Sequence, residues 1–244
     1  MNLAQTLTPD GNTQQLYLHN TDTGRMEILQ NDSHVWLLLD GVVQSAIERT
    51  PPYRPILPHS LVMLLPLIHD KVPKRVLELG GGGLSCQRYL RHTQPSIEFT
   101  SVEANNTVIQ AVTQYFPASE QLNVVHGDGF DAIAKQAASG QTVDWIMLDL
   151  SHDAELPLDD EHPALLNHIV QALAWDGWLI VNCMVQTEEA RLALCATLTR
   201  VFSVRPHLFA VPDMLNHIIL VQKTPKESNQ FRFVQDLERH NLYI

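Results

Sequence analysis

Several features that are scarce or missing in this sequence exclude whole classes of protein. The 244-residue chain has three cysteines, Cys86, Cys183 and Cys195, which are widely spaced and form no Cys-x-x-Cys motif. We therefore expect reduced thiols rather than a disulfide framework, and no metal site built from cysteine and histidine. No apolar run reaches 18 residues, so no membrane-spanning helix is predicted.

Basic residues are also scarce. The chain has 16 Lys plus Arg against 27 Asp plus Glu, which gives a formal net charge of −11. Without a basic excess a protein has little to displace the counterions of DNA or RNA, so we expect no general nucleic-acid binding. The acidic balance is compatible with a cationic small substrate. The first residues show no basic stretch followed by an apolar one, so no secretory signal is expected, and the reduced cysteines favour a cytoplasmic location.

The beginning of the chain has the composition of short strands. Strand-like runs lie at 16–18, 26–29 and 35–39, with turn-forming residues between them, and Asp40-Gly41 closes the third run. These runs predict a small antiparallel β-hairpin region over residues 1–50. Three prolines within 50–55 then disfavour both helix and central strand. We expect a linker followed by a helix over about 59–69, so that 51–73 is a connecting segment.

From about residue 74 the pattern changes to apolar strands that alternate with helices. The predicted strands are 75–79, 98–103, 123–126, 144–150, 178–183, 204–210 and 217–222, and the predicted helices are about 84–93, 106–116, 129–138, 163–174 and 187–201. Such a pattern indicates a doubly wound α/β fold whose sheet is mostly parallel and covered on both faces. The loop 211–216 is too short for a parallel crossover, so the seventh strand is predicted to be antiparallel. We assign this α/β domain to 74–224, and a C-terminal tail or helix to 225–244.

A glycine run follows the first strand of the predicted sheet. Gly80, Gly81, Gly82 and Gly83 stand between that strand and a helix, where glycines permit a tight turn and let a ligand approach the backbone. No Lys-Ser/Thr pair follows, so the run is not a phosphate-binding P-loop. Glu103 ends the next strand about twenty residues further on, where a carboxylate can accept hydrogen bonds from both hydroxyls of a ribose.

Two further acidic residues end strands at the same predicted edge of the sheet. Asp128 stands between Gly127 and Gly129 after the third strand, where it can accept from an adenine amine, cap the following helix, or do both. Asp149 follows the fourth strand and is predicted to face the glycine run, because the carboxyl ends of parallel strands form one crevice. The acidic loop beyond it, 153–161, is compatible with an amine substrate or with a solvated surface.

Together these residues resemble the spermidine synthase (polyamine aminopropyltransferase) family, within the class I S-adenosylmethionine-dependent methyltransferase fold. The strings that carry the resemblance are Leu38-Leu39-Asp40-Gly41-Val42-Val43-Gln44, Lys74-Arg75-Val76-Leu77-Glu78-Leu79 with the glycines, Val102-Glu103, Gly127-Asp128-Gly129, and Asp149 with Ser151. The resemblance implies a small N-terminal β domain, a seven-stranded sheet with a reversed last strand, and S-adenosylmethionine or its decarboxylated form as co-substrate.

The resemblance also implies roles for particular residues. Gln44 matches a glutamine that contacts the nucleoside, Glu103 matches the ribose-binding acid, and Asp128 with Gly129 matches the adenine-binding pair. Asp149 matches the first aspartate of the family's Asp-Ser-Ser-Asp signature. It is our first candidate for the base that takes the proton of an attacking amine. His152 and Asp153 are the next candidates for this catalytic role.

The sequence departs from the family at several places. The family glycine loop carries an aspartate that binds the amine of the aminopropyl tail, and Gly83 stands there. Loss of this carboxylate removes a repulsion against donors that keep their α-carboxylate. The family's Tyr-His-Glu string corresponds to Tyr53-Arg54-Pro55, and His152 stands at the second signature aspartate, so part of the acceptor site is expected to be missing.

Several functions follow from this pattern. Gly83 favours methyl transfer from intact S-adenosylmethionine to a small acceptor, for which an amine is one option. Aminopropyl transfer from the decarboxylated donor to a polyamine is the alternative, and a nucleoside-binding protein without catalysis is another. The glycine run and Glu103 also permit a dinucleotide oxidoreductase, but Gly127-Asp128-Gly129 and the reversed strand count against it. The family often forms dimers, which leaves a homodimer open.

Overall fold

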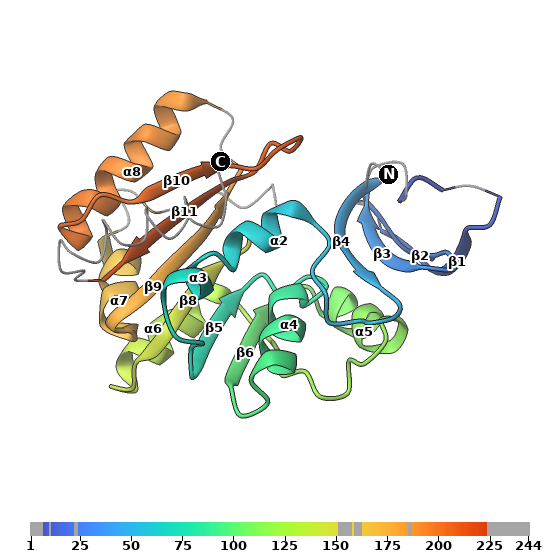
Figure 1. Ribbon diagram of the computed structural model, residues 1–244, viewed down its shortest axis with the longest axis horizontal. Coiled ribbons are helices and arrows are strands. Elements are labelled where there is room, and N and C mark those ends of the chain that lie inside the picture. The colour runs from blue at the N-terminus through green and yellow to red at the C-terminus, as the bar shows by residue number, and fades with distance from the viewer. Residues whose placement is uncertain are drawn as a thin grey trace.

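Two sheets form the framework of the protein in the computed structural model, which describes residues 7–9, 11–21, 24–150, 158, 163–184 and 187–223 (Figure 1). The first is antiparallel and consists of β1 (Gln14–Thr21), β2 (Gly24–Gln30), β3 (His34–Leu39) and β4 (Val42–Glu48) in that order. The first three strands confirm the expected antiparallel region. The strand β4 is an addition to the predicted strands, since the sequence pattern indicates that the third strand-like run ends at Asp40-Gly41.

The turn between β3 and β4 explains the additional strand. Asp40 has φ 49° and Gly41 has φ 79°, so both central residues of this two-residue turn are left-handed. That conformation matches the twist of a hairpin, and Asp-Gly is one of the sequences that adopts it readily. The Asp40 carboxylate also accepts a hydrogen bond from the backbone N–H of Arg25 at 2.7 Å. The turn therefore continues the sheet into β4 instead of closing it.

The connecting segment holds two short helices rather than the single helix expected over 59–69. They are α2 (Pro58–Met63) and α3 (Pro66–His69). Each begins with a proline at its first position, where the missing N–H is not needed. Pro66 has no N–H to donate back into α2, so it starts a new turn instead of extending the old one.

The second sheet has seven strands in the order β10-β11-β9-β8-β5-β6-β7. Its strands are β5 (Arg75–Leu79), β6 (Glu98–Glu103), β7 (Val124–His126), β8 (Val143–Leu148), β9 (Leu173–Cys183), β10 (His207–Ala210) and β11 (His217–Gln222). The helices are α4 (Ser85–Thr93), α5 (Asn106–Tyr115), α6 (Gly129–Ala138), α7 (Pro163–Ala172) and α8 (Glu188–Phe202). The strands β5 to β9 pair in parallel, whereas β11 is antiparallel to both β9 and β10. The expected fold class, including the reversed last strand, is confirmed.

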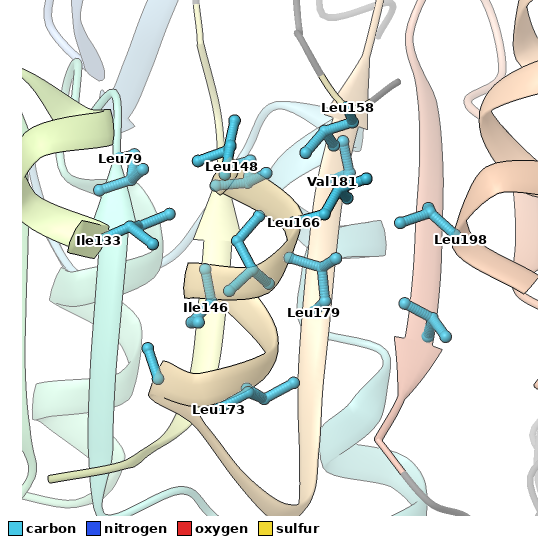
Figure 2. Packing of buried hydrophobic residues seen from close by; sticks show 14 of the residues in the cluster. Leu79, Ile133, Ile146, Leu148, Leu158, Leu166, Leu173, Leu179, Val181 and Leu198 are labelled. Atoms are coloured by element: carbon cyan, nitrogen blue, oxygen red, sulfur yellow. The ribbon is translucent and has the colours of Figure 1, made fainter. Parts of the chain in front are cut away.

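Each face of the large sheet is covered by helices. One hydrophobic cluster joins the sheet to α6, α7 and α8, and Figure 2 shows Leu166 of α7 among side chains of β8 and β9. A second cluster joins the opposite face to α2 and α4. The small sheet packs on α5 through a third cluster, which includes Ile28 and Val112 (Figure 1). These packing layers hold the carboxyl ends of β5, β6, β7 and β8 side by side, with β4 next to them.

A buried glutamine connects α4 to the edge of the sheet. Gln87 is fully buried, and its amide nitrogen donates to the carbonyl of Asn123 at 2.9 Å and to the hydroxyl of Ser101 at 3.2 Å. Its amide oxygen accepts from the backbone N–H of Asn123 at 2.9 Å. This side chain therefore supplies the acceptor for the backbone N–H of Asn123 and a second donor to its carbonyl, which also accepts from the N–H of Ser101 at 3.0 Å.

We expect Gln87→Met to destabilise the fold by about 1–3 kcal/mol, because the backbone N–H of Asn123 loses its acceptor while the side-chain volume is kept. Urea unfolding measures the change. Gln110→Met, at an exposed position of α5, is the matched control and should stay within about 0.5 kcal/mol of the wild type. Equal effects at the two positions would contradict the role assigned to Gln87.

Candidate functional site

The glycine loop that follows β5 is pressed against the end of β8. Gly80 has φ +83°, and a Cβ atom placed on it would lie 2.0 Å from the carbonyl oxygen of Asp149. Its N–H donates to the carbonyl of Val102 at 2.8 Å, on the other side of the loop. A side chain at this position would collide with backbone, so glycine is required for the loop to lie between β6 and β8.

The end of the loop is held by a strand of the small sheet. The N–H of Gly83 donates to the hydroxyl of Ser45 at 2.7 Å, and a Cβ atom on Gly83 would lie 2.4 Å from the Ser45 Cβ. The space that a side chain at position 83 needs is therefore filled by β4. The carbonyl of Gly83 accepts from Arg88 Nε at 3.0 Å. The Arg88 guanidinium also donates to the Ser119 hydroxyl at 2.7 Å, and burial lowers its pKa to about 10.

Glu103 ends β6 directly opposite the glycine loop. One carboxylate oxygen accepts from the N–H of Gly82 at 3.3 Å, and the other accepts from the N–H of Asn105 at 2.8 Å. The two bonds hold the carboxylate in one orientation beside the loop, where the sequence predicts ribose binding.

Asp128 caps α6, with its Oδ1 accepting from the N–H of Asp131 at 2.9 Å. The capping role that the sequence analysis left open is thus present. The side chain is exposed, so its other oxygen remains accessible beside Gly129. The N–H of Gly127 donates to the carbonyl of Glu103 at 3.1 Å, which brings the predicted ribose and adenine residues together.

Asp149 lies just beyond the end of β8. Its N–H donates to the carbonyl of Leu79 at 2.8 Å, and its Oδ1 accepts from the amide of Asn182 at 2.7 Å. The Asn182 amide oxygen in turn accepts from Asn216 at 2.9 Å. This pair of amides, from β9 and the β10–β11 loop, orients the carboxylate. The other catalytic candidates, His152 and Asp153, lie outside the described residues.

A narrow cavity opens between the glycine loop, α2 and β4, and we call it the inner cavity. It is lined by Gln44, Ser45, Leu57, His59, Ser60, Glu78, Gly81, Gly83, Ser85, Cys86 and Asp149. Its volume of about 10 Å³ is close to what one water molecule needs. Of the predicted residues it brings together Gln44, two glycines and Asp149, whereas Glu103 and Asp128 lie outside its lining.

His59 and Ser60 are the polar side chains that the connecting segment contributes to the lining of the inner cavity, whereas Tyr53-Arg54-Pro55 is not part of that lining. Tyr53 stacks on His92 with ring centroids 3.4 Å apart and lines a separate cleft of about 280 Å³. His59 is 7% exposed, and among the described residues its Nδ1 has no hydrogen-bond partner. Burial lowers the pKa of His59 against the opposing influence of Asp149, so the ring is held neutral. An isolated histidine gave no sequence signal, because only the fold brings it to Asp149.

Glu78 also lines the inner cavity, although the sequence did not assign it a role. It is fully buried in β5, and its Oε2 accepts from the Ser101 hydroxyl at 2.5 Å. Burial raises the pKa of Glu78 to about 8, and the charges of Asp149 and Glu103 act in the same direction. The carboxyl is therefore mostly uncharged at neutral pH. One signal was present in the sequence, since a carboxylate interrupts the apolar strand Val76-Leu77-Glu78-Leu79.

The described part of the chain adds three negative findings, on metal ions, membrane spans and disulfides. It contains no group of three or more His, Cys, Asp or Glu side chains arranged to hold a metal ion. Its helices are too short or too polar to cross a membrane. The three cysteines form no disulfide, and burial raises the pKa of Cys86 well above its ordinary value.

A reversed last strand and a glycine loop opposite an acidic strand end define a class I methyltransferase-like fold. Within it, the chain belongs to the spermine/spermidine synthase family, since the model of the "Spermine/spermidine synthase domain" matches residues 56–233. The fold is similar to that of a probable spermidine synthase from Corynebacterium glutamicum, at 18% identity and a TM-score of 0.71 over 91% of this chain and 86% of that one. It also resembles spermidine synthase from Thermotoga maritima, at 21% identity and a TM-score of 0.64 over 91% of this chain and 74% of that one.

Curated relatives include a polyamine aminopropyltransferase of Desulforudis audaxviator, 33% identical over 121 residues, which are 46% of this chain and 40% of that protein. Another, from Shouchella clausii, is 32% identical over 143 residues, which are 55% of this chain and 48% of that protein. The matched stretch thus spans less than half the length of these relatives.

We expect Gly83→Ala to destabilise the protein by about 1–3 kcal/mol, because the new methyl group overlaps the Ser45 side chain. Combining it with Ser45→Gly should recover part of the loss, so that the double variant is at least about 1 kcal/mol more stable than the two single changes predict. Urea unfolding measures all three, with Gly11→Ala, which meets nothing within 4 Å, as the control. Strict additivity would show that Ser45 does not fill the space beside Gly83.

The raised pKa of Glu78 predicts a pH-dependent stability. The folded protein holds this proton between about pH 4.5, the ordinary value, and pH 8, whereas the unfolded chain releases it. The free energy of unfolding contributed by this group is therefore lost as the pH rises through that window. Glu78→Gln cannot ionise, so its melting temperature relative to wild type should rise from pH 5 to pH 9. Exposed Glu98→Gln should show no such trend, and an identical pH profile for Glu78→Gln and wild type would refute the buried titration.

Proposed function

We propose that this protein transfers an aminopropyl group from decarboxylated S-adenosylmethionine to a small amine acceptor. Membership of the spermine/spermidine synthase family supports this reading. The curated aminopropyltransferases among the relatives support it as well. Gly83 by itself favours methyl transfer, whereas the similarity to aminopropyltransferases supports the aminopropyl alternative better. The observation that carries the proposal is the inner cavity, whose lining contains Asp149, Glu78 and a neutral His59 but no Lys or Arg.

Each group of residues has a role in this proposal. Glu103 accepts hydrogen bonds from the ribose hydroxyls, Asp128 and Gly129 bind the adenine, and Gln44 contacts the nucleoside from β4. The tail of the donor then passes the glycine loop towards the inner cavity. The α/β domain 74–224 would bind most of the donor, and the β region 1–50 would complete the site through Gln44 and Ser45.

Asp149 is proposed as the general base. The acceptor amine has a pKa of about 10 in water and attacks only in its neutral form, so a positioned base is needed. The amine nitrogen forms a bond to the methylene carbon next to the sulfonium, and the carbon–sulfur bond breaks to leave neutral methylthioadenosine. The proton of the amine passes to Asp149. His152 and Asp153 remain the next candidates for the base.

The remaining work of the protein is alignment. The sulfonium sulfur leaves as a neutral thioether and needs no further activation. Holding the amine nitrogen in line with the carbon–sulfur bond that breaks therefore accounts for much of the expected rate enhancement. The hydrogen bond from Asn182 to Asp149 supports this by keeping the carboxylate in one orientation.

We expect Asp149→Asn to reduce aminopropyl transfer by about 100-fold or more, because the base is lost. The affinity for methylthioadenosine should change by less than about twofold, since asparagine keeps the oxygen that accepts from Asn182. Mass spectrometry of products from diamines and triamines measures turnover, and calorimetry measures binding. Exposed Asp32→Asn, in the β2–β3 turn, is the control and should behave as wild type. Unchanged turnover in Asp149→Asn would reject its role as the base.

The donor is tested in the same assay. S-adenosylhomocysteine and a methylated amine as the products would establish the methyl transfer that Gly83 suggested. Binding of nucleosides without any transfer would establish a non-catalytic protein. No binding of S-adenosylmethionine, its decarboxylated form or methylthioadenosine would reject the proposed site.

A further inference from the structure

A buried carboxyl group in the inner cavity, that of Glu78, has not yet been assigned a ligand group. Glu78 shares a face of β5 with Val76, which packs in the cluster under α2 and α4, whereas Leu77 and Leu79 belong to the cluster on the opposite face. The Glu78 side chain is 2% exposed and lines the inner cavity together with Gly81 and Gly83. It therefore lies beneath the glycine loop, on the side from which the loop meets α2.

The loop itself cannot supply a carboxylate at this place. An aspartate at position 83 would put its Cβ 2.4 Å from the Cβ of Ser45 and 3.1 Å from the ring of Phe116. Because β4 and α5 fill that space, the only carboxyl groups among the residues that line the inner cavity are Glu78 and Asp149. Asp149 is held by Asn182 in the proposed position of the base. Asp149 is thus assigned to the acceptor amine, and Glu78 is the other carboxyl group of the cavity that can interact with a positively charged group.

The dimensions and partners of the cavity fit an ammonium group. A primary ammonium is about as large as a water molecule, and the cavity volume is about 10 Å³. The Nδ1 atom of His59, buried and without a partner among the described residues, adds a polar atom to the same space. The cavity thus combines an unpaired polar atom with two carboxyl groups, a setting in which a cation is stabilised by charge and by hydrogen bonds.

We propose that Glu78 binds the terminal ammonium group of the donor's aminopropyl tail, and so takes over the carboxylate function that Gly83 lacks. This inference rests on the proposed function, since it names the residue that recognises the donor. Glu78 is then a specificity-determining residue, because an α-carboxylate on the donor would lie next to its charge and be repelled.

Binding of the ammonium group is coupled to the charge of Glu78. Four titratable groups face this carboxyl: Asp149 from β8, Glu103 from β6, Cys86 from α4 and His59 from α2. In the free protein, burial keeps Glu78 mostly protonated at neutral pH. A bound ammonium favours the ionised form, so binding at pH 7 releases close to one proton. The affinity for the decarboxylated donor should then rise by up to tenfold per pH unit from pH 6 towards pH 8.

Calorimetry with three ligands tests this inference. For Glu78→Gln we expect decarboxylated S-adenosylmethionine to bind at least tenfold more weakly, whereas methylthioadenosine, which has no amine on its tail, should bind within twofold of wild type. The control Glu98→Gln lies at the exposed start of β6 and should bind both ligands as the wild type does. Titrations in buffers of different ionisation enthalpy should show proton release in the wild type and none in Glu78→Gln. Intact S-adenosylmethionine should gain affinity relative to the decarboxylated donor in Glu78→Gln.

The outcomes separate this inference from the proposed function. If Glu78→Gln binds both nucleosides equally weakly relative to wild type, or binds the decarboxylated donor as well as wild type does, the role of Glu78 is overturned. The proposed function stands in both cases, because the wild type still binds the nucleosides. If the wild type binds no nucleoside, both proposals fall. Should Glu78→Gln not fold, the wild type alone decides. A dissociation constant for the decarboxylated donor that does not change relative to methylthioadenosine between pH 6 and pH 8 would overturn the inference.

Discussion

The close approach of the Gly80 backbone to the carbonyl of Asp149 is the contact on which the rest of the site depends. It leaves no room for a Cβ atom, and it fixes the distance between the glycine loop and the end of β8. Because Gly80 also donates to Val102, the loop is tied at the same residue to β6, whose last residue is Glu103. A single glycine thus sets the relative positions of the loop, the ribose-binding candidate and the candidate base.

The loop is supported from behind by groups that a purely apolar core would lack. Arg88 donates to the carbonyl of Gly83, and Gln87 of the same helix binds the segment before β7. Burying a guanidinium is costly unless its donors are satisfied, and carbonyl groups and a hydroxyl satisfy them here. The charge of Glu120 opposes the effect of burial on the pKa of Arg88, but its guanidinium donates to carbonyl and hydroxyl oxygens in the hydrogen bonds of the described residues.

Ser45, Gly83 and Glu78 form a coupled set. Ser45 occupies the volume beside Gly83, which excludes a side chain from the loop, and Glu78 offers a carboxyl group from the strand below. A change at position 83, considered alone, suggests a lost function. With Ser45 and Glu78 in place, the glycine at position 83 is compatible with recognition of the donor's ammonium group by β5 instead of the glycine loop. The ligand interacts with a charge at a given position, whichever segment carries that charge.

The sequence by itself determined the α/β fold class, the reversed seventh strand, and the acidic residues at the ends of three strands. These follow from local periodicity, loop length and the geometry of parallel strands. It also contained the Glu78 signal, a carboxylate inside an apolar strand. It missed β4 and gave no indication that His59 lines the inner cavity. Those features depend on which segments meet in space: Ser45 reaches the loop across 38 residues of chain, and His59 reaches Asp149 across 90. Local patterns carry no information about such contacts, so only the packing of the small sheet and α2 against the glycine loop decided the shape and charge of the inner cavity.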